Sequence, residues 1–496
     1  MEITMKKCIG LSALILVFAL MAGTFSACKK AEKAASDELV FCVQGERGSD
    51  IEKRLQLISD GVKEKTGYSI NFRFLSDEAY DLVISSDDNC DLIFAADYKN
   101  YWQNAASGAF AEITDADMEK NAPFIWKNSS KDALNSSKLD GKRYGVVGMS
   151  ARYPDRCFAV RGDLMEKYGI ESIGSIEDME KFLTAVAENE KGIIPYDTDN
   201  GGYQMLLMFG YDWGWAPVGS LDWGQHVYFR LDDPEHKIFI AAEQPEMLEM
   251  TKTMKRWNEK GFFSKSVLSN TKSSLDSFKA GRSAIAAIYT PEEAQGIWSE
   301  FENDERKAWN VKFIPRYHRQ QMNNWGGFIT AISAKSKKKD AALAALNAIY
   351  SSEKLIRLVE LGEEGVNYKI LDNGKMEKIP TTSTSWINTG IRNGAFIPET
   401  NLTFPGAEEL VGELEKMGEY NPAVNCPISD EAVREVKVAM TEVYNSYTNP
   451  RYFGIIDGTP EAALKKEVDK LKKAGIERYI ENMQTQLDAY MKELEE

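Results

Sequence analysis

The stretch Leu39-Val-Phe-Cys-Val43 opens a regular alternation of apolar runs and amphipathic segments that continues to residue 107. The predicted strands are residues 39–43, 69–74 and 91–95, and the predicted helices are 49–66, 77–85 and 98–107. Strands that alternate with helices favour right-handed crossovers and a mostly parallel sheet. We therefore expect an α/β fold in which ligand binds beside the loops Gln44–Gly48 and Ala96–Tyr98, after the carboxyl ends of the strands.

The first of these helices carries signals for both of its ends. Ser49-Asp-Ile-Glu52 has the spacing of a capping box, and Gly67 favours a left-handed stop. Between them, one helical face is apolar, at Ile51, Leu55, Ile58 and Val62.

The later parts of the chain change character several times. Residues 140–149 read as a turn followed by a short strand, and residues 162–188 read as helices. Residues 196–234 are rich in glycine, aspartate and aromatic residues, which favours loops around an aromatic cluster. Within them, Asp197-Thr-Asp-Asn-Gly201 resembles the start of a calcium loop, but Met208 occupies the position of the twelfth ligand, so we interpret it as a turn.

The C-terminal residues predict two helices. Thr459-Pro-Glu461 is typical of a helix start, and Gly475 ends that helix. The second helix should bury an apolar stripe made of Ile476, Ile480, Met483, Leu487, Tyr490 or Met491, and Leu494. We interpret this stripe as core packing and assign it no chemistry.

The N-terminus has the features of an export signal. Lys6 and Lys7 precede the uncharged run Cys8–Met21, and small residues lead to Cys28. The ending Phe25-Ser-Ala-Cys28 resembles the lipobox of bacterial lipoproteins, although Phe25 stands where leucine is usual. We predict a signal peptide over 1–27, lipid on Cys28, and a polar tether over 28–37; the alternative is an uncleaved signal anchor.

Composition narrows the class of protein. The roughly 470 residues after the signal are too many for a single hydrophobic core. This length suggests two large lobes or three smaller ones. A net charge of −16 argues against nucleic-acid partners and against electrostatic attachment to anionic lipid.

Cysteine and histidine usage argues against metal or triad chemistry. Outside the signal and lipid site, Cys42, Cys90, Cys157 and Cys426 are widely and irregularly spaced. We interpret them as buried free thiols; the alternative is a disulfide, for which Cys42 and Cys90 are the pair to check because both flank strands that could be neighbours. With only three histidines, the chain is expected to need no metal or cofactor.

From residue 37 to residue 491, the order of motifs resembles an extracellular solute-binding protein of an ABC sugar importer. The motifs are Asp140-Gly-Lys-Arg-Tyr-Gly145, Arg161-Gly-Asp-Leu-Met-Glu-Lys-Tyr-Gly-Ile170, Arg256-Trp-Asn-Glu-Lys-Gly261, Phe278-Lys-Ala-Gly-Arg-Ser-Ala-Ile285, Trp325-Gly-Gly-Phe-Ile-Thr-Ala-Ile-Ser333, and Leu361-Gly-Glu-Glu-Gly-Val-Asn-Tyr368. The last of these and the C-terminal segment Gln484-Thr-Gln-Leu-Asp-Ala-Tyr490 resemble the longer oligosaccharide-binding lipoproteins, which carry extra C-terminal helices.

The resemblance implies a two-lobed periplasmic-binding-protein-like fold with crossing hinge strands. Lobe I would hold residues 38–148 and 328–395, and lobe II residues 150–326 and 402–496. The resemblance implies capture of a carbohydrate, an oligosaccharide by analogy with this subgroup, through lobe closure, followed by its delivery to an ABC permease. We expect a monomer without enzymatic activity, held outside the cell membrane by lipid.

Sugar chemistry selects the candidate ligand-binding residues. Sugar rings present an apolar face of C–H bonds, which stacks on aromatic rings, and hydroxyls, which need directional hydrogen bonds. Trp325 is the first candidate because it precedes the glycines of the second crossover; the alternative is packing at the hinge. Trp213 and Trp215 lie in a loop-like segment, so we expect at least one to be exposed, and Tyr289 follows an apolar run.

The polar candidates follow predicted strands and the first crossover. Glu46 and Arg47 come after the first strand, and Asp97 and Tyr98 come after the third; each could instead be a solvated loop residue. Arg152 and Tyr153 follow the first crossover, where an arginine could pair with the carboxylate of an acidic sugar.

Two rival functions remain open from the sequence. A lipid-anchored glycoside hydrolase needs a pair of carboxylates, and the 76 acidic residues cannot exclude one. A glycan-binding lipoprotein that is not coupled to transport would have the same composition.

Overall fold

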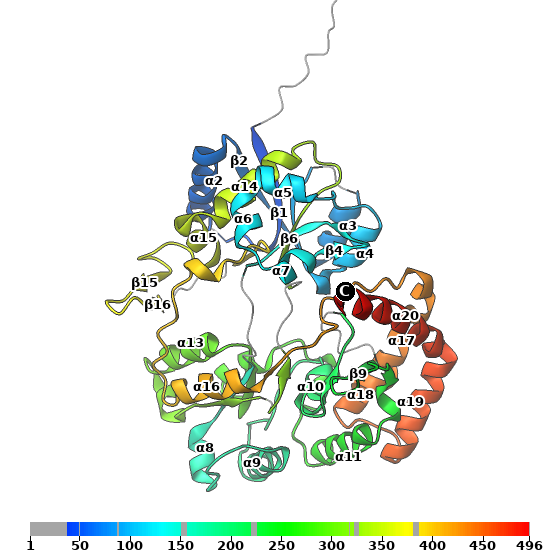
Figure 1. Ribbon diagram of the computed structural model, residues 1–496. Helices are drawn as coiled ribbons and strands as arrows, with labels where there is room; N and C mark the ends of the chain where they lie inside the picture. Colours follow the sequence, from blue (N-terminus) through cyan, green and yellow to red (C-terminus); the bar gives the residue numbers. More distant parts are fainter. Residues whose placement is uncertain are drawn as a thin grey trace, which may run out of the picture.

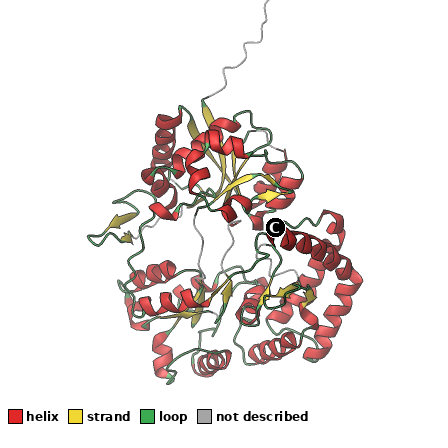
Figure 2. Cartoon of the chain, viewed as in Figure 1, coloured by secondary structure: helices red, strands yellow, loops and turns green. Residues whose placement is uncertain are grey.

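The computed structural model describes residues 37–48, 50–86, 89–149, 156–219, 226–316, 318–321, 327–379 and 386–495. Figure 1 shows two α/β bodies, one above the other, with the C-terminal helices packed along one side of the lower body. Figure 2 shows that strands lie inside each body and helices outside it.

The upper body is built on a six-stranded sheet in the described residues. Its strands follow the order β17-β1-β3-β14-β6, and β2 also pairs with β1. The bounds are β1 (Glu38–Glu46), β2 (Ser69–Leu75), β3 (Leu92–Ala95), β6 (Gly145–Val147), β14 (Ile329–Ile332) and β17 (Trp386–Asn388).

The prediction of a mostly parallel sheet is confirmed for β1, β2, β3 and β6, which share one direction, but not for β14 and β17, which run in the opposite direction. β1 runs parallel to β2 and β3, but β14 runs antiparallel to both β3 and β6, and β17 runs antiparallel to β1. The reason is the point of entry: β14 begins at Ile329 beside Ala95, at the end of β3. The chain therefore enters the sheet at the edge from which β3 leaves it.

Helices cover this sheet, and hydrophobic residues from both layers form its core. The bounds are α2 (Glu52–Thr66), α3 (Asp77–Ser86), α4 (Tyr101–Ala106), α5 (Asp115–Asn121), α6 (Pro123–Asn128), α7 (Lys131–Asn135), α14 (Lys339–Tyr350) and α15 (Glu353–Glu360). Short hairpins join β4 (Lys138–Leu139) to β5 (Lys142–Arg143) and β15 (Tyr368–Ile370) to β16 (Met376–Lys378).

Helix α2 confirms its predicted core face and C-terminal stop but not its cap. Ile51, Leu55, Ile58 and Val62 are buried, and Gly67 ends the helix with a φ of 80°. Ile51, however, occupies the N-cap position and makes no side-chain cap hydrogen bond. Ser49, with which the predicted capping box begins, lies outside the described residues, so the capping box stays a prediction.

Among the described residues, the lower body contains two antiparallel sheets of three strands each. One has the order β11-β7-β12, and the other β10-β9-β8. The bounds are β7 (Cys157–Val160), β8 (Trp215–Ala216), β9 (Val227–Arg230), β10 (Phe239–Ile240), β11 (Ile285–Ile288) and β12 (Lys312–Pro315). Around them lie α8 (Gly162–Lys167), α9 (Ile176–Asn189), α10 (Tyr203–Gly210), α11 (Pro245–Glu259), α12 (Ser274–Lys279), α13 (Pro291–Phe301) and α16 (Ala407–Met417).

Segments that cross between the bodies are paired at both of their ends. In the upper body, the Gly148 N–H donates to the Phe328 carbonyl at 2.9 Å. In the lower body, the Arg316 N–H donates to the Arg156 carbonyl at 3.0 Å. A third segment, which contains Arg392, also connects the upper body to the lower one. The Arg392 carbonyl accepts from the Met149 N–H at 2.7 Å. We propose that the two bodies are the predicted lobes, with the boundaries given above, and call them lobe I and lobe II.

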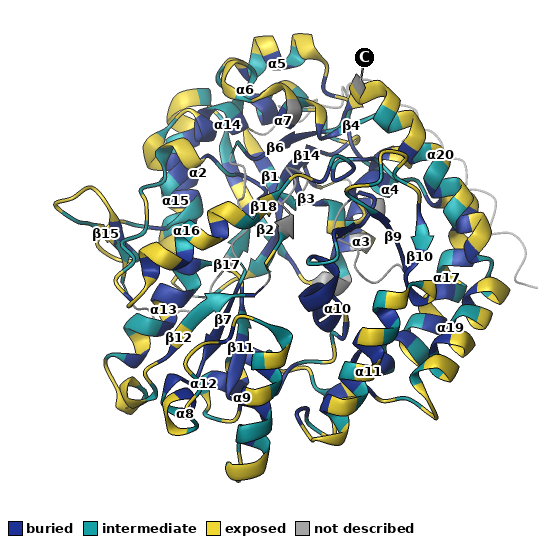
Figure 3. Cartoon of the chain, turned by 60° about the horizontal axis from the view of Figure 1, so that its bottom comes forward, coloured by how far each residue is buried: buried dark blue, intermediate teal, exposed yellow. Residues whose placement is uncertain are grey.

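The C-terminal helices pack against lobe II. Their bounds are α17 (Arg434–Val443), a π-helical segment (Tyr444–Thr448), α18 (Asn449–Tyr452), α19 (Pro460–Ala474) and α20 (Ile476–Glu495). As predicted, α19 begins after Thr459, whose side chain accepts from the Ala462 N–H, and ends at Gly475 with a φ of 95°. Figure 3 shows the exposed outer faces of α19 and α20.

The predicted apolar stripe of α20 is confirmed only over its first turns. Ile476, Met483 and Leu487 are buried, but Leu494 is 51% exposed, so its predicted burial is wrong. Tyr490 and Met491, one turn earlier, still pack against the core of lobe II.

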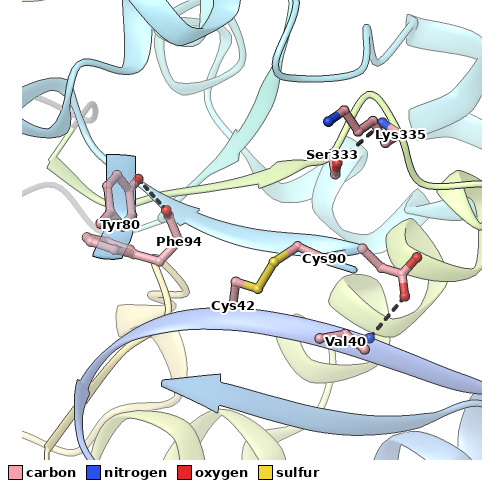
Figure 4. The surroundings of a disulfide bond; sticks show 8 residues. Val40, Cys42, Tyr80, Cys90, Phe94, Ser333 and Lys335 are labelled. Carbon is pink, nitrogen blue, oxygen red and sulfur yellow. Dashed lines mark hydrogen bonds between the residues drawn. A yellow bond between two sulfur atoms is a disulfide. The ribbon is translucent and has the colours of Figure 1, made fainter. Parts of the chain in front are cut away.

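Cys42 and Cys90 form a disulfide, which corrects our preferred interpretation of four free thiols (Figure 4). Cys42 lies in β1, and Cys90 stands just before β3, its parallel neighbour, so the pairing of these strands brings the two Cα atoms to 5.9 Å. Close by, the Asp91 carboxylate accepts from the Val40 N–H at 3.0 Å. Cys157 and Cys426 are buried and free, as predicted.

Candidate functional site

Lobe I presents polar and aromatic side chains at the edge where the crossing segments leave it. Tyr98, in the turn after β3, is 58% exposed, and its N–H donates to Asp97 Oδ1 at 2.6 Å. Asn388, in β17, donates from Nδ2 to Tyr98 Oη at 3.5 Å. Glu46 is exposed at the end of β1, opposite Trp386 in the strand register. Glu46, Asp97 and Tyr98 thus share one edge of the sheet.

Arg47 lies at the same edge but is already engaged with its own lobe. Its Nε and Nη2 donate to the two carboxylate oxygens of Glu52 at 2.6 and 2.8 Å. Its guanidinium also lies 5.8 Å from the centre of the Phe74 ring. These interactions fix the guanidinium over β2 rather than leaving it extended toward lobe II.

The facing edge of lobe II is built by three strands of one sheet. Cys157 at the start of β7 pairs with Ile288 at the end of β11 and with Pro315 at the end of β12. Arg156 and Tyr289 are therefore neighbours at this edge, and the Arg156 guanidinium lies 4.9 Å from the centre of the Tyr289 ring. Tyr289 is 50% exposed, so part of its ring remains open to a ligand.

Helix α10 begins at the same edge. Arg316, which follows β12, donates from Nη2 to the carbonyl and to Oε1 of Gln204, at 3.2 and 2.7 Å. The preceding residue, Tyr203, is 37% exposed. Burial raises the pKa of the Tyr203 hydroxyl, and the nearby Tyr289 and Asp199 raise it further while Arg156 acts in the opposite direction. Tyr203 thus stays a neutral hydrogen-bonding group near Arg156.

The segment Asp197–Gly201 is a turn, as predicted. Asp199 Oδ1 accepts from the Gly201 N–H at 2.9 Å, which closes an Asx turn just before α10. Asp197 points into lobe II, where its carboxylate accepts from the Ser277 hydroxyl at 2.6 Å. The turn therefore uses its carboxylates to hold the chain.

Trp215 does not reach the site, contrary to one of our expectations. It is fully buried, and its ring stacks on Tyr228 at 5.7 Å and packs against Phe239 at 5.0 Å. Trp213 is half-buried, with its ring centre 4.8 Å from that of Trp215. Gly214, with a φ of 70°, lets the chain turn between them, so i and i+2 spacing does not leave either ring fully exposed.

Arg152, Tyr153 and Trp325 lie outside the described residues, as does Cys28. They remain predictions. Tyr203, Asp199 and Asn388 were not singled out from the sequence as ligand-facing, and only the glycines at 201 and 202, just before an aromatic residue, hinted at Tyr203.

The arrangement offers flat rings beside directional hydrogen-bonding groups, which is the combination that sugars require. Tyr98 and Tyr289 supply exposed rings on the two facing edges, while Asp97, Asn388 and Arg156 supply polar groups. Across the part of the chain that the structure describes, no cluster of histidine, cysteine, aspartate or glutamate is arranged to hold a metal ion.

A family model described as bacterial extracellular solute-binding protein matches residues 52–355, more than half of the chain. The chain belongs to this family. The expectation of a solute-binding protein rather than an enzyme is thereby confirmed. Residues 429–492 of this solute-binding protein match a second model, described only as a domain of unknown function (DUF3502). None of the helices in the described residues has the length and apolar character needed to span a membrane.

Individual relatives agree with this family. A carbohydrate ABC transporter substrate-binding protein from Streptococcus pneumoniae is 24% identical over 484 residues, which are 94% of this chain and 93% of the relative. The crystal structure of the N-glycan transport solute-binding protein NgtS from Streptococcus pneumoniae is similar with a TM-score of 0.71 and 20% identity, covering 92% of this chain and 99% of NgtS. The structure of FusA from Streptococcus pneumoniae in complex with kestose is similar with a TM-score of 0.64 and 15% identity. The match covers 92% of this chain and 100% of FusA. These likenesses confirm the predicted periplasmic-binding-protein-like fold.

Proposed function

We propose that this protein is the substrate-binding component of a carbohydrate ABC transporter and that it captures an oligosaccharide between its lobes. The observation that carries the proposal is the placement of Tyr98 and Tyr289. Each tyrosine is about half exposed, at 58% and 50%, and each lies at the sheet edge from which the crossing segments run to the other lobe. Closure of the lobes about those segments would bring the two rings onto one ligand.

The relatives alone do not decide the ligand class, because one similar structure, AlgQ2 with a TM-score of 0.65, is an alginate-binding protein. NgtS has been crystallised with Man5GlcNAc and FusA with kestose, both of which are neutral oligosaccharides. Three arginines of the described residues at the facing edges are engaged within the protein: Arg47 with Glu52, Arg392 with Glu360, and Arg156 with the Tyr289 ring. This engagement supports a neutral oligosaccharide over an acidic one.

Lipid attachment completes the proposal. Lipid on Cys28 and the tether over 28–37 would keep the protein at the membrane surface, where a permease can take the ligand from the closed form. Mass spectrometry of the mature N-terminus tests this, because a lipidated Cys28 adds the mass of acyl chains, which C28S lacks. An unmodified mature chain would leave the receptor without this anchor.

The function itself is tested by titrating a chain that starts at residue 37 with Man5GlcNAc, kestose and an acidic control, an oligouronate. We expect one of the neutral glycans to bind saturably, to remain intact, and to reduce the radius of gyration in solution scattering. Cleavage of the glycan would favour a hydrolase. A tightly bound glycan that leaves the radius unchanged would contradict lobe closure.

A further inference from the structure

We infer that the C-terminal region positions the ligand-facing turn of lobe II through one side chain, that of Asn449. The inference rests on the proposed function, because it assigns the turn over residues 199–203 to the binding site. It gives a role to the region that matches a domain of unknown function. The Asn449 amide accepts from the Gly202 N–H at 2.8 Å through Oδ1 and donates to the Asn200 carbonyl at 3.0 Å through Nδ2.

These two hydrogen bonds add to those that the turn makes within lobe II, where the Gly202 N–H also donates to the Asn200 carbonyl at 3.0 Å and the Asn200 N–H donates to the Asn270 carbonyl at 2.8 Å. Asn200 and Gly202 stand just before α10, where the first backbone N–H groups have no partner within the helix. Gly202 occupies the N-cap position and supplies no side chain to cap the helix. An asparagine from a region about 250 residues away in the sequence therefore binds both a donor and an acceptor of this turn.

The position of Asn449 follows from the proline beside it. Pro450 has no N–H, and in a regular α-helix its ring would clash with the carbonyl of Ser446. The helix avoids this clash by widening to a π-helix over Tyr444–Thr448, in which the Asn449 N–H donates to the Tyr444 carbonyl. The widened turn sets the direction from which Asn449 meets the turn of lobe II.

The contact is too close to tolerate a side chain at position 202. A Cβ atom on Gly202 would lie 2.4 Å from Asn449 Oδ1 and 3.0 Å from Tyr452 Cβ. The Gly202 backbone has ordinary helical angles, with a φ of −58°, so alanine would be acceptable there on conformational grounds. Steric approach of α18 is thus the reason for glycine at this position.

Buried interactions hold α18 in place. The Arg451 guanidinium pairs with Glu467 of α19 and also donates to Thr251 of α11 at 3.4 Å. The Thr448 hydroxyl donates to Glu467 at 2.8 Å. Asn449 therefore extends from a fixed support toward a turn that carries Asp199 and Tyr203 at the ligand-facing edge.

Hydrogen–deuterium exchange on Asn449→Ala measures the positioning without any ligand. We expect faster exchange in the peptide that contains the Gly202 amide, with the rest of lobe II unchanged. Asn449→Asp keeps the acceptor for Gly202 and should retain most of the protection of that amide. Gln484→Ala is the matched control, because Gln484 of α20 accepts from the Ile238 N–H at 2.9 Å and so holds a different loop. In Gln484→Ala, hydrogen–deuterium exchange should become faster only near residue 238.

Affinity then shows whether the positioning serves the ligand. Titration with Man5GlcNAc or kestose, whichever the wild type binds, should show a loss of about fivefold or more for Asn449→Ala, and little change for Gln484→Ala. Gly202→Ala, which leaves Asn449 intact but pushes α18 away, should reproduce the loss if Asn449→Ala does not fold. Unchanged exchange at Gly202, or changed exchange with unchanged affinity, would overturn the inference. If the wild type bound neither glycan, the proposed function would fail, while the exchange result would still judge the contact itself.

Discussion

Arg451 and Glu467 form an ion pair that is almost entirely inside the protein: Nε lies 2.6 Å from Oε2, and each side chain is 2% exposed. The pair joins α18 to α19, and Arg451 also contacts Met247 and Thr251 of α11. Burial opposes ionisation of Glu467, but the Arg451 charge and hydrogen bonds from Arg451 and His226 outweigh it, so the Glu467 pKa falls to about 2.

Removal of one partner of this pair should destabilise the protein strongly. Arg451→Met leaves the Glu467 carboxylate buried without its cation, which costs about 3–5 kcal/mol of unfolding free energy. Urea unfolding at pH 7 measures the loss. Replacing Arg256, whose bidentate partner Glu180 is near the surface, is the control and should cost about 1 kcal/mol or less. Equal losses in the two variants would contradict a special role for burial.

The same pair predicts an acid-dependent stability. Because the folded pKa of Glu467 lies below the ordinary value of 4.5, its contribution is complete above pH 4.5 and is lost as pH falls toward 2. Glu467→Gln should therefore show a shallower decline of unfolding free energy than the wild type over that range. Parallel declines would mean that other carboxylates govern acid unfolding.

Tyr98→Ala and Tyr289→Ala should each weaken glycan binding by about 1 kcal/mol or more, because each removes a ring that stacks on sugar. Isothermal titration with the glycan that the wild type binds measures this loss. Tyr168→Ala is a matched control: its ring lies under the Lys167 ammonium, at 5.3 Å, as Tyr289 lies under Arg156. Tyr168 directly follows helix α8, away from the β7–β11 edge that carries Tyr289. A similar loss in the control would show that the effect is not specific to the proposed site.

The disulfide predicts a definite pattern of thiol labelling. In a chain that starts at residue 37, iodoacetamide in urea should label Cys157 and Cys426 before reduction, and Cys42 and Cys90 only after it. The Cys42→Ala/Cys90→Ala double variant should lose about 2–5 kcal/mol of stability, because its unfolded chain is no longer constrained. Labelling of all four before reduction would show that the bond is absent.

His318 should titrate above its ordinary range. Its Nδ1 lies 2.8 Å from the Asp212 carboxylate and its Nε2 lies 2.6 Å from the Gly174 carbonyl. Both partners only accept hydrogen bonds, so both ring nitrogens must carry protons, and the hydrogen bond to Asp212 raises the His318 pKa against the opposing effect of burial.

The stabilising effect of a raised pKa is complete below the unfolded value of 6.5 and is lost as pH rises through the folded value. His318→Gln should therefore be less stable than the wild type at pH 5.5 but nearly equal at pH 9. NMR titration of the His318 ring checks the pKa directly, and Asp212→Asn should lower it. A wild-type ring that titrates below 6.5 would rule out the charged form at neutral pH.

The sequence predicted local structure well where neighbours along the chain determine it. The face of α2, the Gly67 stop and the α19 caps depend on residues within a few turns, and all were correct. The direction of β14 was not predictable in this way, because its partners β3 and β6 are nearly two hundred residues or more upstream. The Cys42–Cys90 bond depends on the same kind of strand pairing, which explains why four irregularly spaced cysteines gave the wrong preference.

In the candidate site, too, the residues that depend on local signals were predicted and those that depend on distant contacts were not. Glu46, Asp97 and Tyr98 followed from the rule that ligand-facing loops come after strand ends. Trp215 was misjudged because a tryptophan beside glycine suggests a loop, whereas here the rings of Trp213, Tyr228 and Phe239 pack against it. Tyr203 was missed because its exposure depends on a turn that Asn449 holds from the far end of the chain.

The position of β14 also has a consequence for the order in which the protein can fold. This strand lies between β3 and β6 within the sheet of lobe I, yet in the sequence it follows the first segment of lobe II, residues 150–326. During export, the edges of β3 and β6 that pair with β14 have no partner until the chain has emerged as far as residue 332. The lobe that begins first is therefore completed late, and its exposed strands are the part of the newborn protein most in need of protection from aggregation.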